Sequence, residues 1–229
     1  MRQPRPGENI IEVPGLRDRE LVFQDRSEGG RAVAELLQTL ALARPLVLAI
    51  PSGGVPVGLM VARALKAPLD LVIARKLQIP GNPEAGFGAA AVDGPVFLNE
   101  ALVLRLGLGA EAVARAEKKT REELKRREAL FRGRRLAPEL IGRDVIIVDD
   151  GLASGYTMAA AAAWAKAQKP TRLVIAAPTG HLESATRLAR GADFLVCPNL
   201  RAGPSFAVAD AYRQWYDLGD EEVTELLAR

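Results

Sequence analysis

The stretch RDVIIVDDGLASGYTM, residues 143–158, constrains this chain more than any other. Its four consecutive apolar residues, Val145 to Val148, are typical of a strand covered on both faces, as in a parallel sheet. Two aspartates follow directly, and carboxylates are rarely buried without a partner. We therefore expect Asp149 and Asp150 at the end of the strand, facing a ligand that needs hydrogen-bond acceptors or a divalent cation.

The residues after the two acids add a second kind of chemistry. Gly151 and Gly155 allow the backbone to close around a ligand, and Ser154 and Thr157 supply hydroxyl groups just before a predicted helix. Backbone amides at a helix N-terminus favour an anion. Acceptors for a diol beside a cradle for a phosphate together describe a ribose 5-phosphate.

Strands and helices alternate along most of the sequence, which predicts a doubly wound α/β fold: a parallel sheet flanked by helices, with ligands at the carboxyl ends of its strands. Ser27 is a candidate N-cap for the first helix. The expected strands are 46–50, 70–77, 144–149, 172–179 and 193–199, with two short strands in 88–99. The expected helices are 27–42, 55–66, 110–132, 155–168 and 182–191.

Composition limits the class of protein. A chain of 229 residues that is 48% hydrophobic can bury a sizeable core, and we read residues 1–229 as one domain because no repeat or linker interrupts it. It holds no apolar run of membrane-spanning length and no signal-peptide core, so no membrane partner is expected. The lone cysteine, Cys197, permits no internal disulfide, which predicts a cytoplasmic location and a core role for its side chain.

Taken together, VIIVDDGLASGYTM closely resembles the signature of type I phosphoribosyltransferases, which use phosphoribosyl pyrophosphate (PRPP). AIPSGGVPVG resembles the pyrophosphate loop of that family, and ARKLQIPGNPE its later basic loop. The resemblance implies a Rossmann-like core over about 27–200 and a small hood built from about 78–100 and the termini. The Gly/Pro-rich segment 78–90 is then expected to be a mobile loop that acts as a lid.

The resemblance also assigns roles to individual residues. Asp149 and Asp150 would hold the ribose hydroxyls and, through water, Mg²⁺. Because many members carry a basic residue where this chain has Ser52, the pyrophosphate charge is expected to be met by Arg75, Lys76 and magnesium. The implied catalytic residues are Asp149, Asp150, Arg75 and Lys76. The implied PRPP-binding residues are Ser52, Gly53, Gly54, Asp149, Asp150, Gly151, Leu152, Ala153, Ser154, Gly155, Tyr156 and Thr157.

The implied reaction is transfer of a 5-phosphoribosyl group from PRPP to a nitrogenous base, with release of pyrophosphate. Enzymes for 6-oxopurines usually have an acid at the position of Ala153, so adenine and uracil enzymes resemble this chain better there. Phe206 lies in a segment that loosely resembles the base-stacking part of purine enzymes and is the candidate base contact. The sequence does not name the base.

Other interpretations remain open. Some relatives keep the PRPP site and act as nucleic-acid-binding regulators, and residues 111–135 hold ten Lys/Arg against five Glu. Glutamates precede arginines at i,i+4 in this helix, in the expected pairs Glu111–Arg115, Glu117–Arg121, Glu122–Arg126 and Glu123–Arg127. This pattern favours an ordinary solvated face and makes a nucleic-acid partner the weaker hypothesis. The lone His181 is expected at a helix start rather than in catalysis. By resemblance the chain is expected to form a homodimer.

Overall fold

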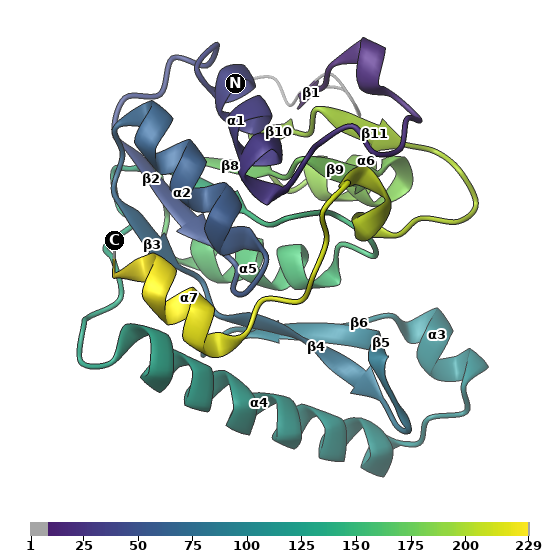
Figure 1. Cartoon of the computed structure of the whole chain (residues 1–229). Helices are drawn as coiled ribbons and strands as arrows, with labels where there is room; N and C mark the ends of the chain where they lie inside the picture. The colour runs from purple at the N-terminus through teal and green to yellow at the C-terminus, as the bar shows by residue number, and fades with distance from the viewer. Residues whose placement is uncertain (1–8, 229) are drawn as a thin grey trace.

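The computed structural model describes residues 9–228, apart from the side chains of residues 83 and 84. Six parallel strands form the central sheet in the order β1-β10-β8-β7-β2-β3, which confirms the predicted doubly wound architecture (Figure 1). The strands are β1 (Ile10–Ile11), β2 (Pro45–Ala49), β3 (Leu69–Leu71), β7 (Asp144–Val148), β8 (Arg172–Ala176) and β10 (Phe194–Val196).

Helices cover both faces of this sheet. On one face α5 and α6 pack against a cluster that includes Leu48, Ile147 and Ile175, all fully buried. On the other face α1 and α2 pack against the alternate residues of the same strands, including Val47 and Ile146. The pleat sends successive side chains to opposite faces, so both faces need apolar residues and the strands read as unbroken apolar runs. The helices are α1 (Arg26–Leu37), α2 (Gly54–Leu65), α5 (Tyr156–Ala167) and α6 (Leu182–Ala189).

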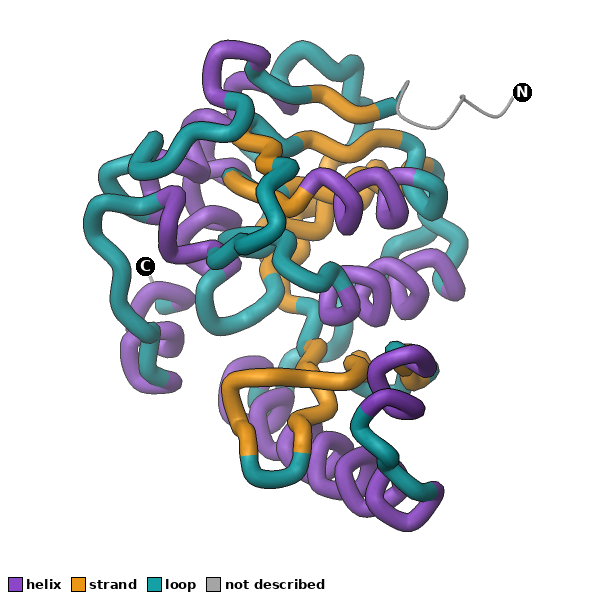
Figure 2. Tube along the Cα trace, turned by 90° about the vertical axis from the view of Figure 1, so that its right-hand side faces the viewer, coloured by secondary structure: helices purple, strands orange, loops and turns teal. Residues whose placement is uncertain are grey.

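A second, antiparallel sheet forms the hood, which lies below the core in Figure 2. The long helix α4 packs against this sheet, and α7 lies near both α2 and the C-terminal half of α4 (Figure 1). The hood elements are β4 (Ala74–Ile79), β5 (Asn82–Ala91), β6 (Val96–Leu98), α3 (Glu100–Arg105) and α4 (Ala110–Arg132), and the C-terminal helix is α7 (Asp220–Leu227). The hood is thus larger than the predicted 78–100.

Shorter elements complete the chain. A two-stranded parallel pair lies beside the core sheet, and two 3-10 turns flank it near the chain ends. These elements are β9 (Thr179–His181), β11 (Asn199–Arg201), η1 (Pro14–Leu16) and η2 (Val208–Ala211). The described N-terminal strand β1 joins the core sheet rather than the hood, and residues 1–8 of the predicted terminal hood element lie outside the described part. No helix among residues 9–228 is both long and apolar enough to cross a bilayer.

The structure differs from the local predictions at five points. The N-cap of α1 is Asp25, whose side chain accepts from the Glu28 amide, so Ser27 is a first-turn residue, and the helix ends at Leu37 rather than 42. The predicted strand 70–77 is two strands in different sheets, because a short strand-like segment does not reveal where the chain leaves one sheet for another. Segment 78–90 is mostly strand, since pairing with β4 overrides its Gly/Pro-rich composition. Helix α3 was not predicted.

Candidate functional site

The loops after β2 and β7 lie side by side because these two strands are neighbours in register. The Ile50 amide donates to the Val148 carbonyl at 2.9 Å, which holds the loops together where they leave the sheet. A Cβ atom at Gly53 would lie 1.8 Å from Asp150 Oδ2, and one at Gly54 would lie 2.7 Å from the Val148 carbonyl oxygen. Only glycine fits at these two positions, so the predicted pyrophosphate loop is in contact with the two predicted acids.

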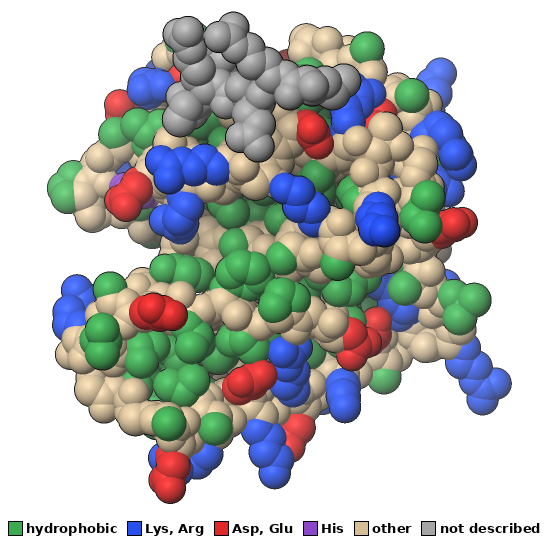
Figure 3. Space-filling model, turned by 180° about the vertical axis from the view of Figure 1, so that it is seen from behind, with side chains coloured by type: hydrophobic (Ala, Val, Ile, Leu, Met, Phe, Trp, Pro, Cys, Tyr) green, Lys and Arg blue, Asp and Glu red, His purple; other side chains and the backbone are tan. Residues whose placement is uncertain are grey.

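A cavity of about 340 Å³ opens between the loop after β7 and the hood. Figure 3 shows the hollow between the core and the hood, with hydrophobic side chains along it. The hood contributes Lys76 of β4 and Ala85, Gly86 and Gly88 of β5. The core contributes Asp149, Gly151, Leu152, Ala153, Ser154, Gly155, Thr157 and Met158. Eight of the predicted site residues therefore line one cavity.

The backbone amides of residues 153–157, here called the amide cradle, belong to the loop that leads into α5 and to its first turn. Gly155 adopts φ +73°, a left-handed conformation that turns the chain into the helix. The Ala153 carbonyl accepts from Ser184 Oγ at 2.6 Å, and the Ser154 carbonyl accepts from Arg187 of α6. Within residues 9–228, the amides of residues 153–157 have no hydrogen-bond acceptor. Amides in this arrangement bind anions, and phosphate most readily.

The two aspartates differ in environment. Asp149 lines the cavity, and its Oδ1 accepts from the Asp150 amide at 2.9 Å. Burial and the neighbouring Asp150 carboxylate raise the pKa of Asp149 well above its ordinary value. Burial also raises the pKa of Asp150, although the Arg26 guanidinium opposes that shift. Asp149 is thus the acid whose charge is least compensated by the protein, which suits a group that awaits hydroxyls or a cation.

Arg26 is a site residue that the sequence did not reveal. Its Nε donates to Asp150 Oδ2 at 2.9 Å, and its Nη1 donates to the Tyr216 carbonyl at 2.9 Å. The guanidinium also lies 3.8 Å from the centre of the Trp215 ring, a cation–π contact. Arg26 lies near the N-terminus, whereas its partners lie in the middle and near the C-terminus of the chain, so no local sequence signal marks the contact. The C-terminal segment therefore helps to orient Asp150.

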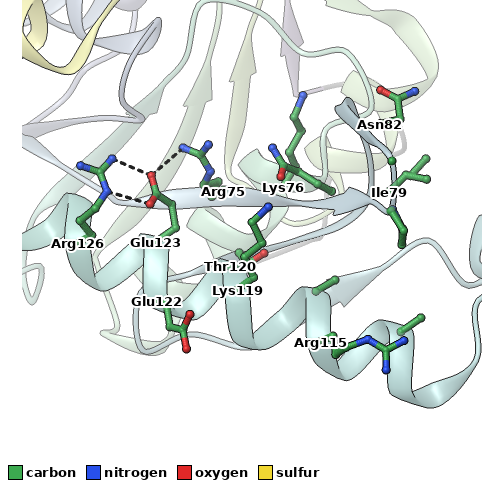
Figure 4. Close-up of a pocket in the computed structure, with 15 residues that line it drawn as sticks. Arg75, Lys76, Ile79, Asn82, Arg115, Lys119, Thr120, Glu122, Glu123 and Arg126 are labelled. Atoms are coloured by element: carbon green, nitrogen blue, oxygen red, sulfur yellow. Dashed lines mark hydrogen bonds and ion pairs between the residues drawn. The ribbon is translucent and has the colours of Figure 1, made fainter.

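Arg75 and Lys76, the predicted basic pair, point into different surroundings. Lys76 lines both the smaller cavity and a second one of about 880 Å³ between β4 and α4, which Figure 4 shows. Arg75 lines only the second cavity, where its Nη1 lies 3.5 Å from Glu123 Oε1. Glu123 also binds Arg126 at 2.8 Å. A carboxylate of the hood already partners both arginines, so Arg75 does not reach the loop cavity in this conformation.

The side chain of Arg127 on α4 does not point where its spacing predicts. Its spacing predicted a pair with Glu123 and a solvated face, but Arg127 turns inward and its Nη2 donates to Ser52 Oγ at 2.7 Å. The expected pairs Glu111–Arg115 and Glu117–Arg121 do form, at 3.2 Å and 3.5 Å. Arg126, expected to pair with Glu122, pairs instead with Glu123 and Asp220. The direction in which a residue of an amphipathic helix points depends on what packs against that helix, which local spacing does not show.

Several predicted residues have surroundings that are mainly structural. Leu152 contributes to the cavity wall but is 1% exposed and packs in the core. The Tyr156 ring lies under the Arg187 guanidinium at 5.4 Å. Phe206 lies edge-on to His181 with ring centres 5.9 Å apart, and its role as base contact stays a prediction. His181 is at the start of α6 and Cys197 is fully buried, as predicted.

A family model confirms the resemblance. The model for the phosphoribosyl transferase domain matches residues 24–208, which include every loop described above. The chain belongs to the phosphoribosyl transferase family. The family's strand–loop–helix signature thus coincides with the cavity, the amide cradle and the paired acids.

Relatives of the chain agree with this membership. Two provisionally named phosphoribosyl transferases from strains of Mycobacterium tuberculosis are each 41% identical over 210 residues, or 91% of this chain. The chain spans only 47% of their length, about half of each relative. The crystal structure of a Thermus thermophilus protein is 35% identical, with a TM-score of 0.72, and the match covers 90% of this chain and 98% of that one.

Proposed function

We propose that this chain transfers a 5-phosphoribosyl group from PRPP to a nitrogen nucleophile and releases pyrophosphate. The observation that carries the proposal is the cavity that Asp149 shares with the amide cradle of residues 153–157. A diol acceptor and an anion cradle on adjoining loops match the two polar ends of a ribose 5-phosphate. The second loop, Ser52 to Gly54, then adjoins the carbon that carries the leaving group.

The reaction needs positioning and charge stabilisation more than proton transfer. The nitrogen lone pair forms a bond to the anomeric carbon as the bond from that carbon to the pyrophosphate oxygen breaks. The electron pair of that bond leaves with pyrophosphate, and the proton on nitrogen passes to solvent. Positive charge develops on the ribose ring, which the nearby carboxylates stabilise. Hood residues of β4 and β5 form the opposite wall and limit access of water.

Magnesium fits this site as an ion shared with the ligand. Among residues 9–228, no group of three or more His, Cys, Asp or Glu side chains is arranged to hold a metal. Asp149, whose carboxylate charge is incompletely compensated, is the residue that would contact Mg²⁺ through water. Asp150 is the lesser candidate for this contact, because its carboxylate pairs with Arg26. When bound, the ion neutralises charge on the diphosphate.

A binding measurement tests the PRPP site directly. Asp149→Asn combined with Asp150→Asn should abolish PRPP binding by calorimetry in the presence of Mg²⁺ while the far-ultraviolet circular dichroism stays unchanged. The control is Asp217→Asn, an exposed acid outside the loops, which should bind as the unaltered protein does. Retained PRPP affinity in the double variant would remove Asp149 and Asp150 from the site.

The acceptor requires a separate screen. Pyrophosphate release would be followed with PRPP and Mg²⁺ against adenine, hypoxanthine, guanine, xanthine, uracil and orotate. Because Ala153 supplies no acid, we expect turnover with adenine or uracil rather than with 6-oxopurines. PRPP binding without turnover of any base, combined with salt-sensitive binding of DNA or RNA in an anisotropy assay, would favour the regulator instead.

A further inference from the structure

The loop from Ser52 to Gly54 contains no charged side chain, although the diphosphate that it adjoins in the proposed reaction carries several negative charges. The amides at the start of α2 supply only partial charges. Arg75 is engaged by Glu123 on the hood. Lys76 lines the neighbouring cavity from the hood, and a further cation reaches the loop itself from α4.

Arg127 brings a guanidinium to this loop from α4. Its Nη2 donates to Ser52 Oγ at 2.7 Å and to Asp220 Oδ1 at 3.0 Å. The side chain is only 10% exposed, whereas that of the adjacent Arg126 is 54% exposed. Burying a guanidinium is costly unless it is hydrogen-bonded and paired. The Arg127 Nε atom is buried without a hydrogen-bond partner among residues 9–228, so the pairing of this side chain is incomplete.

The charges around Arg127 do not balance. Three guanidiniums, those of Arg75, Arg126 and Arg127, share two carboxylates, those of Glu123 and Asp220. One positive charge is left over in this group, next to the loop. Asp220 is divided between two arginines, with Arg126 Nη2 at 2.9 Å from its other oxygen. An anion bound at Ser52 would complete the pairing of Arg127 without displacing either carboxylate.

We propose that Arg127 supplies the positive charge that holds the diphosphate of PRPP at the Ser52–Gly54 loop. The inference rests on the proposed function and identifies a binding residue that the sequence motif does not contain. In the bound state the guanidinium keeps Ser52 Oγ oriented and pairs with a diphosphate oxygen. Arg127 belongs to α4 of the hood and pairs with Asp220 of α7, so a diphosphate bound to Arg127 would connect both helices to the Ser52–Gly54 loop of the core.

Three ligands separate this role from a structural one. PRPP and inorganic pyrophosphate contain the diphosphate, and ribose 5-phosphate does not. In calorimetric titrations with Mg²⁺, Arg127→Gln should lose about tenfold or more in affinity for PRPP and pyrophosphate, because a charge-assisted hydrogen bond is lost. Its affinity for ribose 5-phosphate should stay within about twofold, since the amide cradle at residues 153–157 is not changed.

The matched control is Arg126→Gln. Arg126 directly precedes Arg127 in α4 and also contacts Asp220, but it does not contact Ser52. All three affinities should stay within about twofold of the unaltered protein in this variant. If Arg127→Gln does not fold, Arg127→Lys gives the same comparison, with a loss of severalfold for pyrophosphate because lysine does not reproduce the planar donor geometry.

The outcomes are distinct. An equal loss of all three ligands in the Arg127 variants means that the residue only supports the fold, and unchanged pyrophosphate affinity means that it does not meet the diphosphate. Either result overturns the inference while leaving the proposed function in place. Failure of the unaltered protein to bind PRPP overturns both.

Discussion

Arg26 and Asp150 form an ion pair across 124 residues of sequence, with Arg26 Nε 2.9 Å from Asp150 Oδ2 and side-chain exposures of 7% and 15%. The pair adjoins the pyrophosphate loop, because the same Oδ2 atom would lie 1.8 Å from a Cβ atom at Gly53. One carboxylate thus connects the first helix of the core to both ligand loops. Asp150 is held in position by protein contacts, whereas Asp149 is left facing the cavity.

Arg26→Gln should destabilise the fold and make ligand binding sensitive to acid. Removing one partner of a largely buried pair costs about 3–5 kcal/mol. The pKa of Asp150 should rise further, because the variant lacks the guanidinium that opposes the effect of burial. PRPP affinity should therefore fall more at pH 5.5 than at pH 8. Chemical denaturation measures the loss of stability, and PRPP titrations at both pH values measure the change in affinity. The control is Arg63→Gln, which alters an exposed arginine. An equal PRPP affinity of Arg26→Gln at the two pH values would contradict the expectation.

Asp149→Asn should raise stability at neutral pH while it weakens PRPP binding. The pKa of Asp149 in the folded protein lies above its ordinary value of 3.8, so the folded state holds this proton more tightly than the unfolded state does. Stability therefore falls as the pH rises from about 4 through the folded-state pKa. Asparagine is neutral, and its Oδ1 can still accept from the Asp150 amide. Thermal denaturation from pH 4 to pH 8 should show that the Tm of the variant is a few degrees higher than that of the unaltered protein at pH 7, with no difference near pH 4. A lower Tm of the variant at pH 7 would count against the burial of this charge.

Gly53→Ala should disable the pyrophosphate loop. The new methyl group would lie 1.8 Å from Asp150 Oδ2 and 2.4 Å from its Cγ, so either the loop or the acid must move. Overpacking of this kind costs about 1–3 kcal/mol, and PRPP affinity should fall by at least tenfold because both ligand loops shift. Gly15→Ala is the control, since nothing lies within 4 Å of its Cβ position. Unchanged PRPP affinity in Gly53→Ala shows that the loop does not contact the ligand.

The β4–β5 hairpin should become protected when PRPP binds. Gly81 turns the chain between these strands with φ +81°, and Lys76, Gly86 and Gly88 from the hairpin line the cavity. A ligand that bridges core and hood should slow amide exchange at residues 76–90, because opening of the hairpin then requires release of the ligand. Hydrogen–deuterium exchange with and without PRPP measures this, with α1 as internal reference. Equal exchange in both states means that the hairpin is not a lid.

The family and the ribose-phosphate site could be predicted from the sequence because the residues that indicate them are neighbours along the chain. A four-residue apolar run, two acids and a Gly/Ser/Thr loop before a helix are contiguous in sequence, and parallel strands bring their carboxyl ends to one edge whatever the rest of the chain does. The loops after β2 and β7 accordingly lie side by side at that edge. Seven of the eight predicted residues that line the cavity belong to this contiguous stretch, and the eighth, Lys76, comes from the hood.

The orientation of charged side chains had to come from the tertiary structure. Arg127 has the spacing of a solvated helix residue, yet packing of α4 and α7 near the Ser52 loop buries it. Arg26 meets Asp150 and Trp215 only because the first helix and the C-terminal segment converge on one loop. Arg75 was predicted at the pyrophosphate and instead pairs with Glu123, because β4 leaves the core sheet for the hood. A long charged side chain pairs with whatever folding brings within its reach, and sequence spacing fixes only neighbours on the same element.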